Sequence, residues 1–418
     1  MSTRPSLRIR QFTVKNYRLF RDPVTFDLAD GDGPADGIVV FHGDNGAGKS
    51  TALSALQLFF SGAAYFFANN EDAKDKAHHR RAAMDGYSGF GPVDRDWPFG
   101  VLDPIEVEVT FEDNTLGTMR LAVILSGPEH KVRLQRIMDG REQPIAADLR
   151  NLLATLFSTP SGGESRPWVR FDPRRRESAV PRRDEASNFE SPVTDLMARN
   201  LLSLLGSFDG LDRDRWRAFV RDVTSFETLS GLEVDMFMND VRFERRGQLV
   251  LRHSELSSGE QQVAALVAAG LTARASIIAI EEPELSLSPR NQNQLRQILQ
   301  NQIDDGLVDQ FFLETHSPAF DGPRVVRLAR KGDKVDVART ASETPAPGLK
   351  EKAVEQGGDI QWVTQEGYTK LPPRMIEEMG VPAGGFLCFL PDDDGRWQAW
   401  RASELDEEFG IGSADRDE

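Results

Sequence analysis

A glycine-rich loop that carries one lysine is the clearest chemical feature of the sequence. Gly43-Asp-Asn-Gly-Ala-Gly-Lys-Ser50 matches the pattern GxxxxGK[ST] at every required position. The loop follows an apolar run at 37–42 and precedes a helical pattern at 51–60, the setting that phosphate binding requires. Glycines let backbone N–H groups approach phosphate oxygens, and the start of the helix adds partial positive charge. The predicted nucleotide-binding residues are Gly43, Asp44, Asn45, Gly46, Ala47, Gly48, Lys49, Ser50 and Thr51.

Two side chains of this loop have specific roles in such a site. We expect Lys49 to neutralise the β- and γ-phosphates and Ser50 to bind Mg²⁺. The alternative is an ordinary glycine turn between a strand and a helix, which the complete match disfavours.

A second candidate element is an apolar strand that ends in carboxylates, Ser276-Ile-Ile-Ala-Ile-Glu281-Glu282-Pro283-Glu284. A strand that is apolar on both faces places such carboxylates at its C-terminal edge, where α/β sheets bind ligands. We expect Glu281 to hold Mg²⁺ opposite Ser50, directly or through water. Glu282 would orient and polarise the attacking water. The alternative is a solvated acidic turn after a strand.

A histidine follows the next apolar strand, in Phe311-Phe-Leu-Glu-Thr-His316-Ser-Pro318. A lone histidine is usually structural or exposed, but this one comes after the acidic strand. We therefore predict that His316 donates a hydrogen bond to the γ-phosphate and senses its loss.

A serine-rich segment, Leu256-Ser-Ser-Gly-Glu-Gln-Gln262, precedes a helical pattern. Ser257 and Glu260 have the spacing of a capping box, which is also found on ordinary helices. The same geometry aims a helix N-terminus at an anion, here a γ-phosphate. Ser257, Ser258, Gly259 and Glu260 are therefore added to the predicted nucleotide-binding residues.

The glycine loop, the serine-rich segment, the acidic strand and the histidine, together as a set, resemble the ABC ATPase superfamily over about 7–337, with an insertion. Within it the chain looks most like the RecF, SMC (structural maintenance of chromosomes) and OLD (overcoming lysogenization defect) ATPases. Ile9–Phe20 is similar to their first strand, and Glu282–Pro289 and Thr315–Pro318 are similar to the OLD-like group. Two positions depart from the common pattern: Glu281 replaces an aspartate, and Ser258 replaces a glycine.

The resemblance implies an α/β fold, an ABC-type P-loop ATPase head that binds ATP with Mg²⁺ and hydrolyses it. It also implies a homodimer or higher oligomer, in which Ser257, Ser258 and Gly259 touch the ATP bound by Lys49 of the other chain. A glutamine loop is expected but has no assigned position, since Gln57 lies inside the first predicted helix.

Composition limits the class of protein. The net charge of −16 argues against a wholly basic nucleic-acid-binding surface, so any DNA contact would be local. The one cysteine, Cys388, fits a reducing cytosol. No apolar run has the length of a membrane helix and the start lacks a signal-peptide pattern, so we expect a cytoplasmic protein without a membrane partner.

Patterns along the chain suggest an ATPase head that is split by a helical insertion and followed by a small β-rich module. The expected divisions are the N-terminal segment of the head (1–141), the insertion (142–245), the C-terminal segment of the head (246–340), a linker (341–358), an AbrB-like module (359–405) and an acidic tail (406–418).

Within the insertion, helices are expected at 146–157, 195–205 and 213–226, with a loop or disordered segment at 158–191. That segment contains arginines that could meet phosphates, although a solvated loop is the favoured alternative: Arg166, Arg170, Arg174, Arg175, Arg176, Arg182 and Arg183. His78–Arg81 is a weaker basic patch.

Near the C-terminus, 363–380 has the pattern of strand, turn and short helix, and 386–390 with 396–400 that of a hairpin. This layout resembles an AbrB-type swapped hairpin, a dimeric unit that often binds DNA. Because the segment is acidic, dimerisation or docking of a partner is the favoured role.

Function beyond ATP hydrolysis rests on the resemblance. Stand-alone OLD-like heads act in bacterial antiphage defence beside a separate effector, and no nuclease motif is evident. We therefore expect a sensor or regulatory ATPase whose partner is a nuclease or toxin. The alternative is a RecF/SMC-like DNA repair or recombination ATPase. A transporter ATPase is disfavoured by the opening strand and by Glu282-Pro-Glu284, and a non-enzymatic binding module would require Glu282 to be dispensable.

Overall fold

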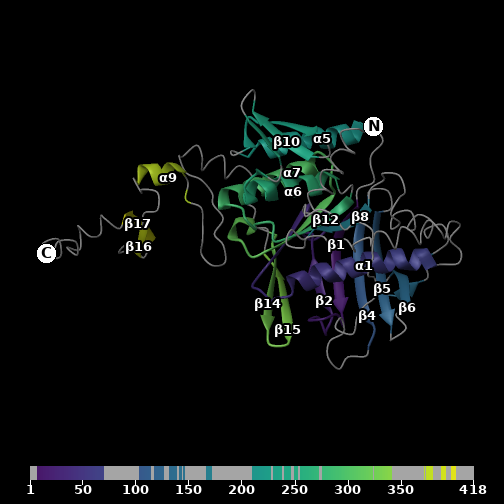
Figure 1. Ribbon diagram of the computed structural model, residues 1–418. Helices are drawn as coiled ribbons and strands as arrows, with labels where there is room; N and C mark the ends of the chain where they lie inside the picture. Colours follow the sequence, from purple (N-terminus) through teal and green to yellow (C-terminus); the bar gives the residue numbers. More distant parts are fainter. Residues whose placement is uncertain are drawn as a thin grey trace. The chain divides into compact units, whose positions relative to one another are not determined.

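Two compact units divide the chain, Met1–Ser342 and Glu343–Glu418 (Figure 1). The computed structural model describes residues 7–69, 103–113, 117–126, 131–138, 141–143, 145, 166–171, 210–226, 229–237, 240–245, 249–252, 255–272, 275–322, 324–340, 371, 373–379, 387–391 and 397–401.

The first unit contains an antiparallel sheet with the strand order β2-β1-β4-β5-β6-β7. Every second residue of β4 is buried, as the strict alternation of its sequence predicts. The strands are β1 (Leu7–Lys15), β2 (Val24–Asp27), β4 (Ile105–Asp113), β5 (Gly117–Ser126), β6 (Lys131–Met138) and β7 (Arg141–Gln143).

A second, mostly parallel sheet of the same unit has the order β15-β14-β3-β13-β12-β8. Only β15 runs antiparallel to its neighbour. Alternate residues of β12 enter opposite cores, Ile277 on one face and Ile278 on the other, which explains its continuous apolar sequence. The strands are β3 (Ile38–His42), β8 (Arg166–Phe171), β12 (Ala275–Glu281), β13 (Gln310–Thr315), β14 (Val326–Lys331) and β15 (Lys334–Arg339).

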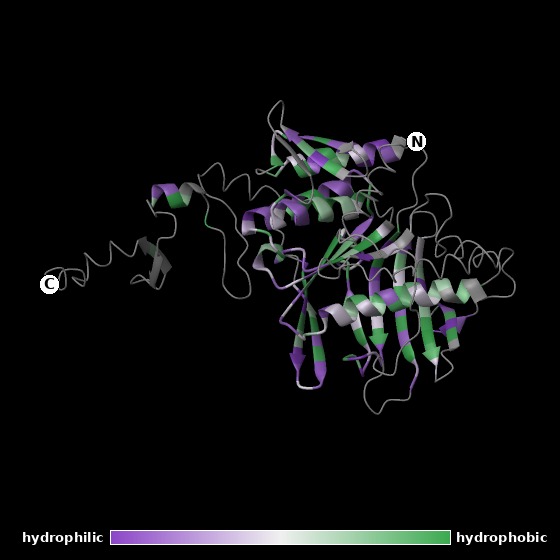
Figure 2. Cartoon of the chain, viewed as in Figure 1, coloured by the Kyte–Doolittle hydropathy of each residue, from purple (hydrophilic) through white to green (hydrophobic). Residues whose placement is uncertain are grey.

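Helix α1 (Lys49–Asn69) fills the space between the two sheets. Figure 2 shows its largely hydrophobic surface beside the hydrophobic residues of β4 and β5. The packing is close, because a Cβ at Gly62 would come within 2.7 Å of Val123 Cγ1. This core fixes α1, and therefore fixes the loop at its N-terminus.

Helices and a small sheet cover the other face of the parallel sheet (Figure 1). The small sheet has the order β11-β10-β9. These elements are α5 (Gly210–Thr224), α6 (Ser258–Thr272), α7 (Pro289–Asp304), β9 (Glu233–Phe237), β10 (Asp240–Arg245) and β11 (Leu249–Arg252), with a 3₁₀ turn η4 (Pro318–Phe320).

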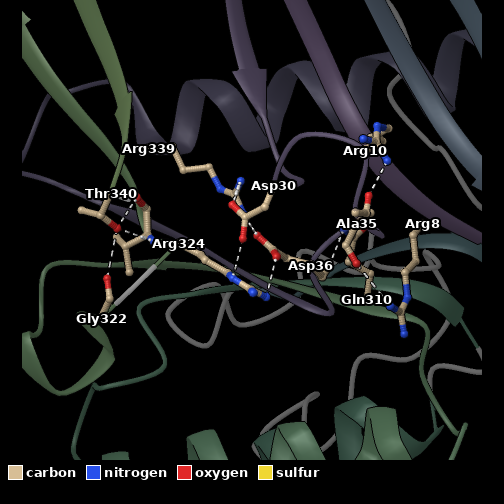
Figure 3. A network of polar contacts seen from close by, with 12 residues as sticks. Arg8, Arg10, Asp30, Ala35, Asp36, Gln310, Gly322, Arg324, Arg339 and Thr340 are labelled. Carbon is tan, nitrogen blue, oxygen red and sulfur yellow. Dashed lines mark hydrogen bonds and ion pairs between the residues drawn. The ribbon is translucent and has the colours of Figure 1, made fainter. Parts of the chain in front are cut away.

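A polar network joins the N-terminal ends of the parallel strands to the antiparallel sheet (Figure 3). Arg339 contacts Asp30 at 2.6 Å and Asp36 at 2.5 Å, and Arg324 lies 2.8 Å from Asp30. Gln310, the first residue of β13, accepts from Ile9 N at 2.8 Å and donates to the Ile9 and Asp36 carbonyls at 2.9 Å. The network therefore ties β1 to β13 at this edge.

The expected insertion 142–245 is not purely helical. Residues 166–171, expected as a loop or disordered segment, form β8 and pair in parallel with β12, so that prediction was wrong for them. Strands β9 and β10 also lie in this range, whereas α5 matches the helix predicted at 213–226. The helices predicted at 146–157 and 195–205, and His78–Arg81, lie outside the described residues.

The second unit contains a short helix, α9 (Pro373–Glu378), and an antiparallel hairpin of β16 (Leu387–Pro391) and β17 (Trp397–Arg401). The helix and the hairpin agree with the sequence pattern, while the AbrB-type resemblance stays a prediction. The linker 341–358 and the tail 406–418 lie outside the described residues. None of the helices in the described ranges is long and apolar enough to cross a membrane.

Candidate functional site

Three neighbouring parallel strands end at one edge of the sheet. Strand β13 lies between β3 and β12, and its register pairs Glu314 with Glu281 on one side and Thr315 with His42 on the other. The phosphate loop follows β3, and the predicted histidine follows β13. The structure thus brings the predicted loop, acidic strand and histidine to the same edge.

The glycines of the loop have a structural reason to be glycine. Gly43, Gly46 and Gly48 have φ values of 151°, 80° and 105°, where L side chains are strained. A Cβ at Gly43 would also come within 2.2 Å of the Leu328 carbonyl oxygen on β14. Without side chains at these positions, an anion can approach the backbone of the loop closely.

Lys49 begins α1 and is 5% exposed. Its Nζ donates to the carbonyl oxygens of Gly43 at 2.6 Å and Asp44 at 3.0 Å, so it lies across the loop. Burial lowers the pKa of Lys49, while Glu314, Glu284 and Asp44 act to raise it. A buried ammonium against a glycine-rich loop suits a polyphosphate.

Ser50 contacts a carboxylate that the sequence analysis did not select. Its Oγ donates to Oε1 of Glu314, which lies near the end of β13, two residues before His316. Glu314 is 5% exposed, and burial raises the pKa of its carboxyl, with the hydrogen bond from Ser50 as the main opposing cause. The available signal was a single carboxylate inside the apolar run of β13.

Glu281, the predicted partner of Mg²⁺, is held by the edge strand β8. Its Oε1 accepts from Arg170 Nε, and Arg170 also donates from NH1 to Ser54 Oγ at 2.8 Å. The placement of Arg170 in a solvated arginine loop was therefore wrong. Of the other arginines in that segment, only Arg166 lies within the described residues, in β8.

The donors at this edge fit Mg²⁺ with a nucleotide. Ser50, Glu281 and Glu314 offer the oxygen atoms that this hard cation prefers. Across the described part of the chain, no three His, Cys, Asp or Glu side chains group to hold a metal by themselves.

Glu282, the predicted catalytic carboxylate, follows β12 in an uncommon backbone conformation. Its φ is 43°, and its N–H donates to the Glu314 carbonyl oxygen at 2.7 Å. A left-handed conformation at a residue other than glycine costs free energy and is concentrated at functional sites. The bond to β13 fixes Glu282 at the edge next to the loop.

His316 has a partner that the sequence analysis also missed. Its side chain is 52% exposed, and its Nδ1 lies 3.2 Å from Oε1 of the buried Glu284. The same oxygen accepts from the His316 backbone N–H at 3.1 Å. Glu284 therefore orients the imidazole while leaving it accessible.

The N-terminus of α6 contains the predicted capping box. Ser257 N donates to Glu260 Oε2 at 2.8 Å, and Glu260 N donates to Ser257 Oγ at 3.4 Å. Ser257 and Ser258 are exposed. A Cβ at Gly259 would come within 2.8 Å of the Ser286 carbonyl oxygen, so α6 starts against the turn that follows the acidic strand.

The side chain of Gln57, on α1, is hydrogen-bonded to two neighbouring side chains. It accepts from Trp168 Nε1 at 2.7 Å and donates to Ser61 Oγ at 3.1 Å. This agrees with the expectation that Gln57 is not the glutamine loop.

Comparisons with known proteins give two family matches. The family "AAA ATPase domain" matches residues 8–136, and the family "AAA domain, putative AbiEii toxin, Type IV TA system" matches residues 173–321. No curated protein matches the chain.

Solved structures of SMC heads are also similar. An SMC head domain from Thermotoga maritima has 14% identity and a TM-score of 0.45, over 80% of this chain and 99% of the other. A Smc head with an extended coiled coil, bound to the C-terminal domain of ScpA and derived from Pyrococcus furiosus, has 14% identity and a TM-score of 0.44, over 84% and 99%.

The first family match contains the phosphate loop, and the second contains the serine-rich segment, the acidic strand and His316. These matches confirm the prediction that the chain is an ATPase.

Proposed function

We propose that the chain is an ABC-type switch that pairs with a second copy around two MgATP and regulates a separate effector in bacterial antiphage defence. The observation that carries the proposal is the shared edge of β3, β13 and β12, with the phosphate loop on one side and the strand-end carboxylates on the other. The exposed N-terminus of α6 supplies the surface for the second copy.

The residues at this edge divide the chemistry between them. Mg²⁺ bound with the nucleotide supplies neutralisation of phosphate charge. Lys49 and the loop N–H groups would bind and orient the phosphates, and Ser50 and Glu281 would hold the Mg²⁺. Glu282 orients the attacking water, and His316, aligned by Glu284, donates to the γ-phosphate.

Pairing of two copies follows from the start of α6. The first N–H groups of a helix lack partners within the helix, and its dipole favours an anion. Ser257 and Ser258 are exposed beside them, so a γ-phosphate held by Lys49 of the other chain would complete the cap. Hydrolysis removes that charge and loosens the pair, which is how a switch is reset.

The defence role is supported by two observations. The family that matches 173–321 is described as a putative AbiEii toxin of a Type IV TA system, which links this kind of ATPase domain to toxin systems, and the sequence has no evident nuclease motif of its own. We therefore assign the toxic or nuclease step to a separate protein. The acidic second unit is a candidate for dimerisation or docking of that partner. Any DNA contact would be local.

Two substitutions test the ATPase switch. Lys49→Ala should lose binding of a fluorescent ATP analogue, because the ammonium over the loop is gone. Glu282→Gln should still bind the analogue, lose about 100-fold or more in turnover, and accumulate as an ATP-dependent dimer in light scattering. Lys334→Ala, an exposed lysine on β15, is the control and should behave as wild type.

Different outcomes contradict different elements of the proposal. ATP binding and pairing by Lys49→Ala at wild-type levels would refute the nucleotide site. Equal turnover by Glu282→Gln and wild type would refute the role of Glu282. For the defence role, the chain and its neighbouring genes should protect a host from phage, and Lys49→Ala should abolish the protection; a host that stays fully sensitive with the wild-type chain contradicts it.

A further inference from the structure

The end of β13 is the central position of the candidate site. Strand β13 lies between the strand that leads into the phosphate loop and the strand that carries the acidic end. Glu314, next to last in β13, pairs in register with Phe41 on β3 and Glu281 on β12. Any group at Glu314 therefore lies between the loop and the predicted metal-binding carboxylate.

The side chain of Glu314 has one oxygen engaged and one available. Oε1 accepts from Ser50 Oγ. Oε2 is buried and makes no hydrogen bond with any residue in the described ranges. A buried carboxylate oxygen without a donor is costly, and a cost of this kind in a folded protein requires an explanation. A cation that binds beside Ser50 would supply the missing partner.

Glu281 is paired with an arginine, whereas Glu314 contacts the loop serine. Its Oε1 accepts from Arg170, whose guanidinium is anchored on Ser54. The ion pair is mostly buried, with 16% of the Arg170 side chain and 14% of the Glu281 side chain exposed. Of the two carboxylates that share this register, Glu314 is therefore the one in contact with the serine of the loop.

We propose that Glu314 is a metal-binding residue of the nucleotide site. It places a carboxylate oxygen on Mg²⁺ together with Ser50, while Arg170 holds Glu281 as the second carboxylate of the site. Mg²⁺ sites that hold nucleotides commonly use one or two carboxylates with phosphate oxygens and water. The proposal rests on the nucleotide site proposed above and adds a residue to it. The competing role for Glu314 is that it only orients Ser50.

The test is metal affinity, measured separately from turnover. Mn²⁺ binding to the full chain with a non-hydrolysable ATP analogue is followed by electron paramagnetic resonance, for wild type, Glu314→Gln and the exposed control Glu142→Gln. Glu314→Gln should weaken Mn²⁺ binding about 10- to 100-fold, and Glu142→Gln should leave it unchanged. Analogue binding in EDTA should be equal in all three proteins. Wild-type Mn²⁺ affinity in Glu314→Gln overturns the proposal.

A second background separates metal binding from positioning. In Ser50→Ala protein, a residue that only orients Ser50 has nothing left to orient, so adding Glu314→Gln would then change nothing and overturn the proposal. A further loss of Mn²⁺ affinity supports direct binding. Failure of the wild-type chain to bind the analogue with Mn²⁺ present would instead refute the nucleotide site itself, so the two failures are distinguishable.

Discussion

The two edges of the parallel sheet both contain buried charges, but they balance them differently. At the N-terminal edge, Asp30 and Asp36 alternate with Arg324 and Arg339 in a closed set of ion pairs (Figure 3). At the C-terminal edge, a group of carboxylates lies around Lys49 and Arg170, namely Glu281, Glu284 and Glu314.

The difference distinguishes charges that stabilise the fold from charges that are suited to bind a ligand. The paired charges balance one another, so they need no further ion and can join two sheets. An excess of buried and half-buried carboxylates, with Lys49 hydrogen-bonded to its own loop, is costly until cations and phosphates bind. Active sites commonly accept such costs in exchange for function. Substitutions at the two edges should therefore affect different measurements.

The largest effect is expected from Arg339→Met at the balanced edge. The substitution leaves the buried Asp36 without its main partner, and burial already raises the pKa of that carboxyl. The free energy of unfolding should fall by about 3 kcal/mol, measured by chemical denaturation. Analogue binding by the folded protein should be unchanged.

Lys334→Met on the same strand is the matched control. Its ion pair with Asp22 is exposed on both sides and should contribute less than about 1 kcal/mol. Equal losses from the two substitutions would show that the network does not hold the sheets together, and the comparison of the edges would fail.

Glu314→Gln at the other edge should not lower the free energy of unfolding. The glutamine can still accept from Ser50, while the buried charge beside Glu281 is removed. We expect the free energy of unfolding without nucleotide to stay level or rise by about 1 kcal/mol, in the same denaturation experiment. A loss of the size expected for Arg339→Met would make Glu314 a structural residue.

Short sequence patterns predicted several elements of the C-terminal edge. Each of three patterns is formed by a short continuous segment: the phosphate loop, the capping box of Ser257 and Glu260, and the apolar strand ending at Glu281. Such patterns fix an element and its end without reference to the rest of the chain. The short helix and hairpin of the second unit were predictable for the same reason.

The features that the sequence did not predict depend on contacts between distant residues. Glu314 meets Ser50 across 264 positions, and neither residue type predicts the other. Strand β8 is short, has no clear alternation and lies in an arginine- and proline-rich stretch, so composition indicated a loop. Its place is set by pairing with β12 and by Trp168, which stacks on Phe60 with ring centroids 5.2 Å apart.

The smallest effect is expected away from both edges, at Asp222 on α5. This carboxylate is 2% exposed and accepts from Arg221 Nε at 2.7 Å and from Gln302 Nε2 at 3.2 Å. Burial raises its pKa above 3.8, and its two partners only partly oppose this. It resembles the balanced edge in having partners, and neither Arg221 nor Gln302 belongs to the candidate nucleotide site.

The sign of its pH dependence follows from that shift. Because the folded protein binds this proton more tightly than the unfolded chain, the stabilisation is complete below pH 3.8 and is lost as the pH rises through the folded-state pKa. The stability of wild type relative to Asp222→Asn should therefore decrease from pH 4 towards pH 7, by about 1 kcal/mol or less. Denaturation at several pH values measures this, with Asp214→Asn, exposed on the same helix, as background. A stability difference between wild type and Asp222→Asn that grows with pH would mean that the ion pair with Arg221 outweighs burial. A change in analogue binding by Asp222→Asn would link Asp222 to the nucleotide site and contradict the comparison of the edges.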